Sequence, residues 1–147
     1  MIIVSTSPID VAALAAEFLH DVDDAGAVAT FTGIVRREGA VGVEALSLEH
    51  APGLTENAIA KAAGEASARW PLLKRLVVHR VGRIAVGEAI VFVATAATHR
   101  RDAFEACAFL MDFLKTDAPF WKKQISRSGD EWIEPRAEDY DDRDRWR

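Results

Sequence analysis

Blocks of hydrophobic and polar positions along the chain predict short strands interrupted by three helices. Runs rich in β-branched and apolar residues, which are typical of strands, occupy Ile2–Val4, Ala27–Val35, Val43–His50, Leu73–Val81, Ala89–Ala97 and Phe120–Ser126. Apolar residues recur at helical spacing from Ser7-Pro8 to about His20, over Thr55–Trp70 and over Arg101–Lys115. The predicted order of elements is therefore βαββαββαβ.

Capping and stop signals mark the ends of these helices. Ser7 offers an N-cap before Pro8 in the first turn, Thr55 is the candidate N-cap of the second helix, and Pro71 ends that helix. The first helix has one apolar face, made of Val11, Leu14, Ala15 and Phe18. The third helix is expected to bury one apolar face, made of Phe104, Cys107, Ala108, Met111 and Leu114.

Short connections indicate that neighbouring strands pair in antiparallel fashion. The loop-like gap Glu38–Gly42 predicts a hairpin between the strands on either side of it. The runs Leu73–Val81 and Ala89–Ala97 are expected to be adjacent strands, separated by Gly82 and Gly87. The pattern favours the α+β class, with helices packed on antiparallel or mixed sheets.

Length and composition predict a single domain over residues 1–147. Half of the residues are hydrophobic, enough for a buried core, and the one cysteine excludes an internal disulfide. The acidic segment 130–147 is expected to be an extension that lies on the surface or touches a partner. A net charge of −5 disfavours nucleic acid and anionic membranes as partners. With no signal-peptide or membrane-span pattern, we expect a cytoplasmic protein.

Cationic residues nevertheless gather at the predicted ends of elements. They are Arg36-Arg37, His99-Arg100-Arg101, Lys115 and Lys122-Lys123. If the sheet brings these ends together, they form a pocket for a phosphate or a carboxylate. The alternative is that each is a solvated charge at an element boundary, and the spacing alone leaves this alternative open.

The segment Leu114–Lys123 places lysines around a proline and two large aromatic residues. An ammonium group surrounded by aromatic rings is partly desolvated, which lowers its pKa and lets it exchange protons near neutral pH. In the alternative interpretation, Phe120 and Trp121 are ordinary core residues and the lysines extend beside them into solvent. The residue pattern does not decide between the two.

The remaining chemistry-bearing residues predict no cofactor. Cys107 lies on the apolar face of the third helix, which favours a buried and inert thiol. His20, His50 and His79 have no cysteine or carboxylate at the paired spacing of a metal site. There is no glycine-rich phosphate loop. We therefore expect neither a metal nor a nucleotide cofactor.

Six motifs carry a resemblance to a known family. FTGIVR, LEHAPG, RWP, HRVG, HR and MDFLKTDAPFWKK, which start at residues 31, 48, 69, 79, 99 and 111, closely resemble the large, catalytic subunit of molybdopterin synthase in order and spacing. The match runs from about Ala25 to about Trp146, and the last motif is highly specific. The resemblance implies an α/β hammerhead-like fold and a sulfurtransferase of molybdenum cofactor biosynthesis.

In that family two large subunits form a central homodimer, and each binds a small ubiquitin-like subunit, giving a heterotetramer. The C-terminal Gly-Gly thiocarboxylate of the small subunit supplies sulfur to cyclic pyranopterin monophosphate. The resemblance makes Lys115 the catalytic lysine and places Lys122 beside the inserted thiocarboxylate. The residues it assigns to the anionic substrate pocket are Arg36, His99 and Arg100.

The resemblance gives weaker support to four further substrate contacts: Ile34, Val35, Lys123 and Gln124. One family member has lysine where Ile34 stands and an Arg-Glu pair where Lys123-Gln124 stand, so a charged contact at position 34 could not survive here. The competing function is a non-catalytic α+β module that binds an anion or a peptide tail through the same basic pocket. Loss of turnover with retained partner binding in Lys115→Ala would separate the two.

Overall fold

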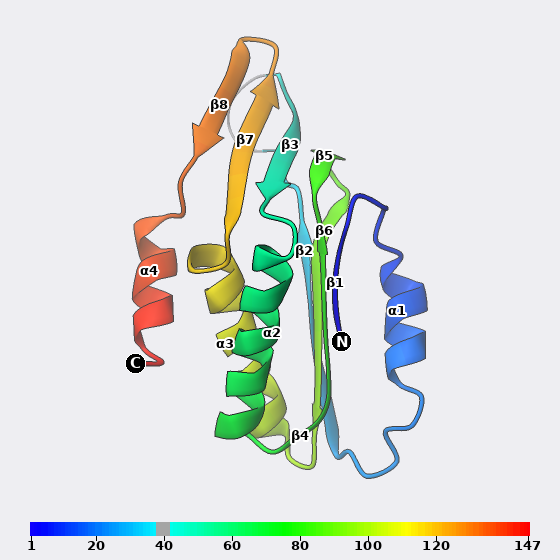
Figure 1. Cartoon of the computed structure of the whole chain (residues 1–147). Coiled ribbons are helices and arrows are strands. Elements are labelled where there is room, and N and C mark those ends of the chain that lie inside the picture. Colours follow the sequence, from blue (N-terminus) through cyan, green and yellow to red (C-terminus); the bar gives the residue numbers. More distant parts are fainter. Residues whose placement is uncertain (38–41) are drawn as a thin grey trace.

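The computed structural model describes residues 1–37 and 42–147, and within them the chain forms two sheets and four helices (Figure 1). The strands are β1 (Ile2–Ser5), β2 (Ala27–Ile34), β3 (Val43–His50), β4 (Leu72–Arg80), β5 (Gly82–Ala85), β6 (Ala89–Ala97), β7 (Phe120–Ser126) and β8 (Gly129–Ile133). The helices are α1 (Val11–Phe18), α2 (Leu54–Arg69), α3 (Arg100–Thr116) and α4 (Ala137–Asp144).

The first sheet has the strand order β1-β4-β6-β2 and contains the main core. β1 runs parallel to β4, whereas the other pairs are antiparallel. Helices α2 and α3 lie on one face of this sheet and α1 lies on the other (Figure 1). The central strand β6 is apolar nearly throughout, and β4 is buried from Leu76 to Arg80, because both faces of these strands are covered there.

The second sheet has the order β5-β3-β7-β8 and is antiparallel throughout. It extends beyond the ends of α2 and α3 (Figure 1). A small cluster of buried residues joins the two sheets: Val35, Leu48, Val81 and Ile84. The α+β class with mixed sheets and packed helices is confirmed.

The predicted hairpin between the second and third strands is wrong. β2 pairs with β6 in the first sheet, whereas β3 pairs with β5 and β7 in the second sheet. The physical reason is the residue pattern: Ala29 and Val28 of β2 pack into the hydrophobic clusters of the first sheet, whereas β3 alternates between core residues and exposed polar residues such as Glu44 and Glu49. Of the predicted gap, residues 38–41 lie outside the described part of the chain.

Two helix starts also differ from prediction. α1 begins at Val11 rather than after Ser7, because the Asp10 carboxylate caps it by accepting a hydrogen bond of 3.0 Å from the Ala13 N–H. α2 begins at Leu54, and its N-cap is Gly53, whose φ of 84° suits glycine. Thr55 therefore lies inside the first turn and is not the cap.

The predicted apolar face of α3 is only partly correct. Cys107 and Leu114 are buried as predicted, but Phe104 is 65% exposed, and the buried face turns instead toward Ala106 and Leu110. The elements β5, β8 and α4 were not predicted, because β5 and β8 are only four and five residues long and α4 is mostly polar. No helix in the described residues is long and apolar enough to cross a membrane.

Candidate functional site

A cleft of about 520 Å³ opens where the two sheets meet the end of α3. Its walls come from the end of β2, the last turn of α3, the inner face of β7 and the segment that joins β8 to α4. The charged and polar residues that line it include Arg36, Lys115, Lys122, Gln124, Glu134, Arg136 and Asp139. Sites of this kind, concave and with a few convergent polar groups, are the usual places for small-molecule binding.

Lys115 and Lys122 come from different elements and line the same cleft. Lys115 lies in the last turn of α3, where a cation interacts favourably with the helix dipole. Lys122 lies on β7, and alternation along a strand puts Gln124 on the same side. Lys123 points to the other face, with its ammonium 4.5 Å from the centre of the Trp132 ring. Two lysines thus meet at one site, and Lys123 lies outside it.

The end of β2 carries three more of the predicted residues into the cleft. Ile34 and Arg36 line the cleft, and both are exposed. Val35 between them is buried, its N–H donates to the Glu88 carbonyl at 3.0 Å, and its carbonyl accepts the Gly87 N–H at 2.7 Å. These two backbone bonds hold the strand end from which the Arg36 side chain extends.

The imidazole of His79 is buried behind the lysines. Its pKa is lowered to about 4, mainly by burial and also by the positive charges of Lys122 and Lys115, against a raising effect from the hydrogen bond with the Arg80 carbonyl. The ring stacks on Phe120 with centroids 4.1 Å apart. His79 is therefore neutral at physiological pH and adds no charge beside the two ammonium groups.

Arg136 lines the cleft as well, although it was not among the predicted site residues. Its backbone N–H and its guanidinium both donate to the Asp139 carboxylate, at 2.9 and 3.3 Å, and this hydrogen bonding raises the pKa of Arg136. The one signal in the sequence was an acidic residue three positions after Arg136, at the start of a short helix. Arg136 adds a second guanidinium opposite Arg36.

His99 and Arg100 lie at the other end of α3 and do not line this cleft. They border a separate depression of about 320 Å³, together with Arg101, Phe104 and Glu105. A helix rises about 1.5 Å per residue, so the length of α3 separates Arg100 from Lys115 by roughly 20 Å. Within one chain, the structure does not bring these two predicted groups together.

The described residues contain no group of three or more histidine, cysteine, aspartate or glutamate side chains placed to hold a metal ion. Cys107 is buried and free, and burial raises the pKa of its thiol to about 11. A protonated, buried thiol is a poor nucleophile. Neither metal ligation nor cysteine chemistry is therefore evident in the described part of the chain.

Comparison with known proteins identifies the family. The family model described as MoaE protein matches residues 4–117. The chain is 49% identical to the molybdopterin synthase catalytic subunit of Caulobacter vibrioides, covering 99% of this chain and 97% of that protein. It is 48% identical to the molybdopterin synthase catalytic subunit of Escherichia coli, over 88% and 87% of the two chains.

Solved structures agree with the sequence relatives. The MoaE protein of Burkholderia ambifaria superposes with a TM-score of 0.84 at 44% identity, covering 99% of this chain and 97% of that one. Molybdopterin synthase from Staphylococcus aureus superposes with a TM-score of 0.80 at 28% identity, over 88% and 94% of the two chains. This chain belongs to the MoaE family, whose members among these relatives are molybdopterin synthase catalytic subunits.

Proposed function

We propose that this chain is the catalytic subunit of a molybdopterin synthase and that the cleft between Lys115 and Lys122 is its reaction site. The reaction transfers sulfur from the thiocarboxylated C-terminus of a small ubiquitin-like subunit to cyclic pyranopterin monophosphate. The observation that carries the proposal is the convergence of the two lysines from α3 and β7 in one cleft, in a chain of the MoaE family.

The charge of the cleft suits both reactants. Although the whole chain carries a net charge of −5, Arg36, Lys115, Lys122 and Arg136 line the cleft against only two acidic residues, Glu134 and Asp139. Guanidinium groups bind phosphate oxygens in bidentate geometry, so Arg36 is assigned to the substrate phosphate. Lys122, at the inner wall, is assigned to the carboxylate-like end of the donor tail. Ile34, Val35 and Gln124 shape the same cleft.

The chemical step needs proton transfer and stabilisation of negative charge, and Lys115 is placed to supply both. The thiocarboxylate sulfur forms a bond to a side-chain carbon of the pterin precursor as a carbon–oxygen bond at that carbon breaks, and Lys115 stabilises the charge on the departing oxygen and protonates it. Water then cleaves the acyl–sulfur bond, which leaves the sulfur on the pterin and a carboxylate on the donor tail. Two donor tails supply the two sulfurs. The sulfur comes from outside the chain, since Cys107 is buried.

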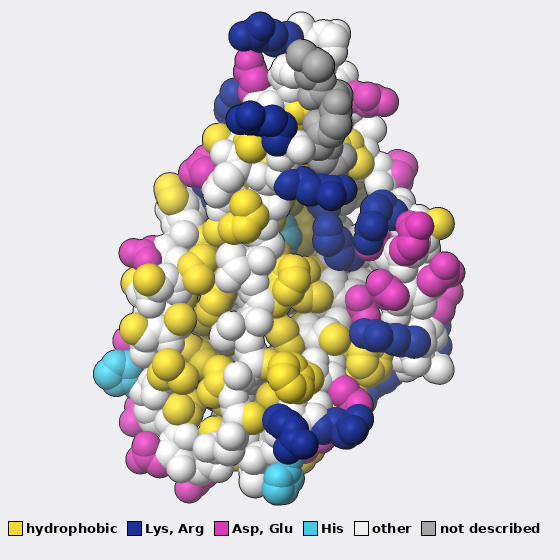
Figure 2. Space-filling model, turned by 180° about the vertical axis from the view of Figure 1, so that it is seen from behind, with side chains coloured by type: hydrophobic (Ala, Val, Ile, Leu, Met, Phe, Trp, Pro, Cys, Tyr) yellow, Lys and Arg dark blue, Asp and Glu magenta, His cyan; other side chains and the backbone are white. Residues whose placement is uncertain are grey.

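His99 and Arg100 reach a substrate in this proposal only from a second copy of the chain. The outer side of α3 carries Phe104, Ala108 and Met111, beside Phe31 on the edge strand β2. Figure 2 shows apolar side chains gathered on this face, with basic side chains above and below them. Two copies packed with antiparallel α3 helices would cover this apolar band and carry Arg100 of one copy to Lys115 of the other.

Single-domain organisation and cytoplasmic residence belong to the same proposal. Trp146 packs against Trp70 and Phe109, with ring centroids 5.4 and 5.8 Å apart, which supports treating the extension 130–147 as part of one domain. A free, unpaired cysteine agrees with a reducing compartment. Cell fractionation with an antibody to the chain tests the location.

Reconstitution tests the function. The purified chain is mixed with thiocarboxylated small subunit and cyclic pyranopterin monophosphate, and molybdopterin is measured by the fluorescence of its oxidised product. We expect Lys115→Ala to lower the rate by at least about 100-fold, because a positioned acid–base group contributes 10²–10⁴-fold. The matched control is Lys61→Ala, which removes an exposed lysine of α2 and should retain the full rate.

Two outcomes would contradict the proposal. Undiminished product from Lys115→Ala would remove this lysine from the mechanism. Binding of the small subunit and of the pterin without any product from the wild-type chain would instead favour the non-catalytic binding module.

A further inference from the structure

The turn that joins α3 to β7 determines how the two cleft lysines face each other. Lys115 is the next-to-last residue of α3, Lys122 is the third residue of β7, and only Asp117, Ala118 and Pro119 lie between the two elements. The N–H groups of Asp117 and Ala118 both donate to the Phe113 carbonyl, at 2.9 and 3.0 Å. Any displacement of this turn changes the separation of the two ammonium groups.

A threonine from a distant part of the sequence holds the turn through a hydrogen bond. Thr55, in the first turn of α2, is completely buried. Its hydroxyl donates to the Pro119 carbonyl at 2.9 Å and accepts the Ala51 N–H, also at 2.9 Å. Both hydrogen-bonding capacities of the hydroxyl are therefore used. The bond spans 64 positions of sequence and joins the start of α2 to the start of β7.

A second contact fixes the residue that follows the turn. Phe120 stacks on the His79 ring, with the two planes 24° apart, and pairs with His50 across the β3–β7 ladder. The His79 ring is itself held by a 2.9 Å hydrogen bond between its Nδ1 and the Arg80 carbonyl. Phe120 lies two positions before Lys122 on the same side of the strand. The hydrogen bond at Pro119 and the ring stacking at Phe120 therefore hold the start of β7 on both sides of the peptide bond between these two residues.

We propose that Thr55 is a positioning residue of the sulfur-transfer site, which holds the Pro119 carbonyl so that Lys115 and Lys122 face the same cleft. This inference rests on the proposed function. In it, Thr55 contacts neither reactant directly. Loss of the hydroxyl would leave the partly buried Pro119 carbonyl without this donor, and the turn would move to find another. A displacement of about 1 Å at a catalytic group can lower a rate on the order of 100-fold.

Two variants separate the effect of the Thr55 hydroxyl from the effect of its γ-methyl group. Thr55→Ser and Thr55→Ala both lack the γ-methyl group and differ only in the oxygen atom. We expect Thr55→Ser to keep kcat within about threefold of the wild type and Thr55→Ala to lower kcat by tenfold or more, within the loss that misplacement of a catalytic group can cause. KM for the pterin should remain unchanged in both, because Arg36 is unaffected.

Ser67→Ala is the matched control. The Ser67 hydroxyl accepts a hydrogen bond from Arg75 and ties the other end of α2 to β4, away from the cleft. This variant should lose thermal stability as Thr55→Ala does, yet keep kcat. A structural role alone would predict that kcat follows the melting temperature in all three variants, and that result would overturn the proposal. Equal kcat in Thr55→Ser and Thr55→Ala would overturn it too.

Amide hydrogen exchange separates this inference from the proposed function. We expect the amides of residues 117–122 to exchange faster in Thr55→Ala but not in Thr55→Ser, whatever reaction the chain catalyses. A wild-type chain that makes no molybdopterin, but shows this difference, would refute the proposed function and leave the hydroxyl tie in place. Unchanged exchange in both variants would refute the tie itself.

Discussion

His79 is a buried imidazole, and its protonation state follows from its surroundings. It lies at the end of β4, stacked on Phe120, with Lys122, Lys115 and His50 as the titratable groups that act on it. Burial favours the neutral ring, and the same side chain in an unfolded chain would titrate near its ordinary value of 6.5. The residue therefore links stability to pH beside the candidate site.

The sign of this linkage gives a prediction. Between pH 6.5 and about 4, the unfolded chain binds a proton at His79 that the folded chain does not, so the free energy of unfolding falls as the pH falls through this window. The expected loss is on the order of 3 kcal/mol, at 1.36 kcal/mol per pKa unit. Urea unfolding at pH 7 and pH 4 measures it.

The variants His79→Gln and His20→Gln provide the comparison. Carboxylates also titrate in this range, so the contribution of His79 is the difference in pH dependence between the wild type and His79→Gln. His20 is exposed, and His20→Gln should keep the wild-type dependence. An equal pH dependence in all three proteins would mean that His79 protonates in the folded chain at its ordinary pKa.

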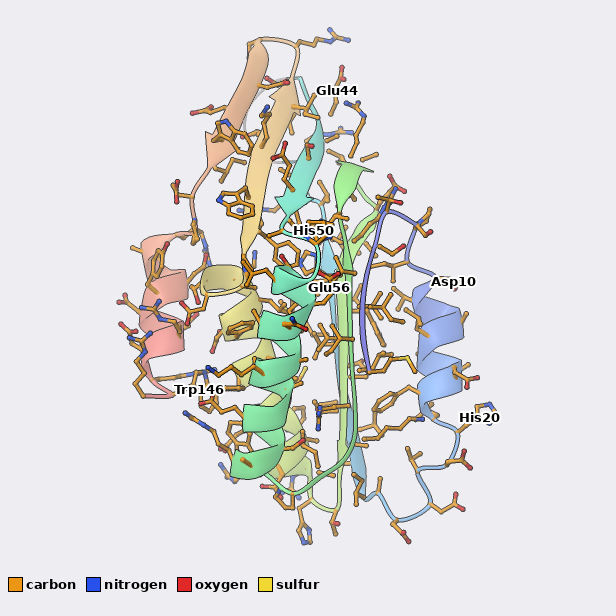
Figure 3. All side chains as sticks on the ribbon, in the orientation of Figure 1. Asp10, His20, Glu44, His50, Glu56 and Trp146 are labelled. Atoms are coloured by element: carbon orange, nitrogen blue, oxygen red, sulfur yellow. The ribbon has the colours of Figure 1, made fainter. Side chains whose placement is uncertain are left out.

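Among the elements, the C-terminal helix α4 is joined to α3 by side-chain hydrogen bonds and ion pairs. It is followed by Trp146, which Figure 3 labels at the end of α4 next to the other helices. The Trp146 indole N–H donates to Asp112 on α3 at 2.6 Å, and Arg143 pairs with Asp117 at 2.9 Å. Because Arg136 immediately precedes α4, these contacts also hold one wall of the cleft.

Trp146→Ala should therefore affect both stability and substrate binding. We expect the free energy of unfolding to fall by about 3 kcal/mol, as for other large-to-small changes at aromatic clusters, and KM for the pterin to rise more than kcat falls. Urea unfolding and steady-state rates measure the two effects. The control Trp132→Ala removes an indole that is 53% exposed and should cost about 1 kcal/mol or less.

A stable variant with an unchanged KM would contradict this account. In that case α4 would keep its place without Trp146, held by the ion pairs of Arg143 and Arg145 with Asp117 and Asp112.

The whole molecule presents an apolar band between two basic regions. Phe104 and Phe31, 65% and 42% exposed, lie on α3 and the edge strand β2, with Lys115 toward one end of α3 and Arg100 at the other. Exposed aromatic residues flanked by charges are typical of protein interfaces. A twofold axis through the band would place complementary ends of α3 side by side and complete two equivalent sites.

Mixed dimers test this arrangement. Homodimers of Lys115→Ala and of Arg100→Ala should both have low activity, whereas co-purified dimers with one chain of each kind should recover about half of the wild-type rate, since one site then has both residues intact. Reconstitution with dimers carrying two different affinity tags measures the rate. No recovery would mean that each chain uses its own Arg100. A fully active Arg100→Ala homodimer would mean that Arg100 binds no substrate.

Particular residues show how far prediction from sequence could reach. Lys115 and Lys122 were identified from one motif, and the structure puts both on the same cleft. Thr55 was expected to cap its helix because threonine often does so, but Gly53 takes that position and leaves the hydroxyl free to bind Pro119. Phe104 fits the helical spacing of a core residue, yet α3 turns it outward. Local pattern cannot distinguish a face covered by the same chain from one left for a partner.

The sequence by itself determined the helices α1, α2 and α3, six of the strands and the family, because apolar periodicity and short motifs are local properties of the chain. Only the tertiary structure decided that β2 and β3 belong to different sheets, that Arg136 joins Arg36 at the cleft, and that Arg100 lies far from Lys115. These are matters of contacts between residues distant in sequence. Such contacts depend on how whole elements pack, which no single segment encodes.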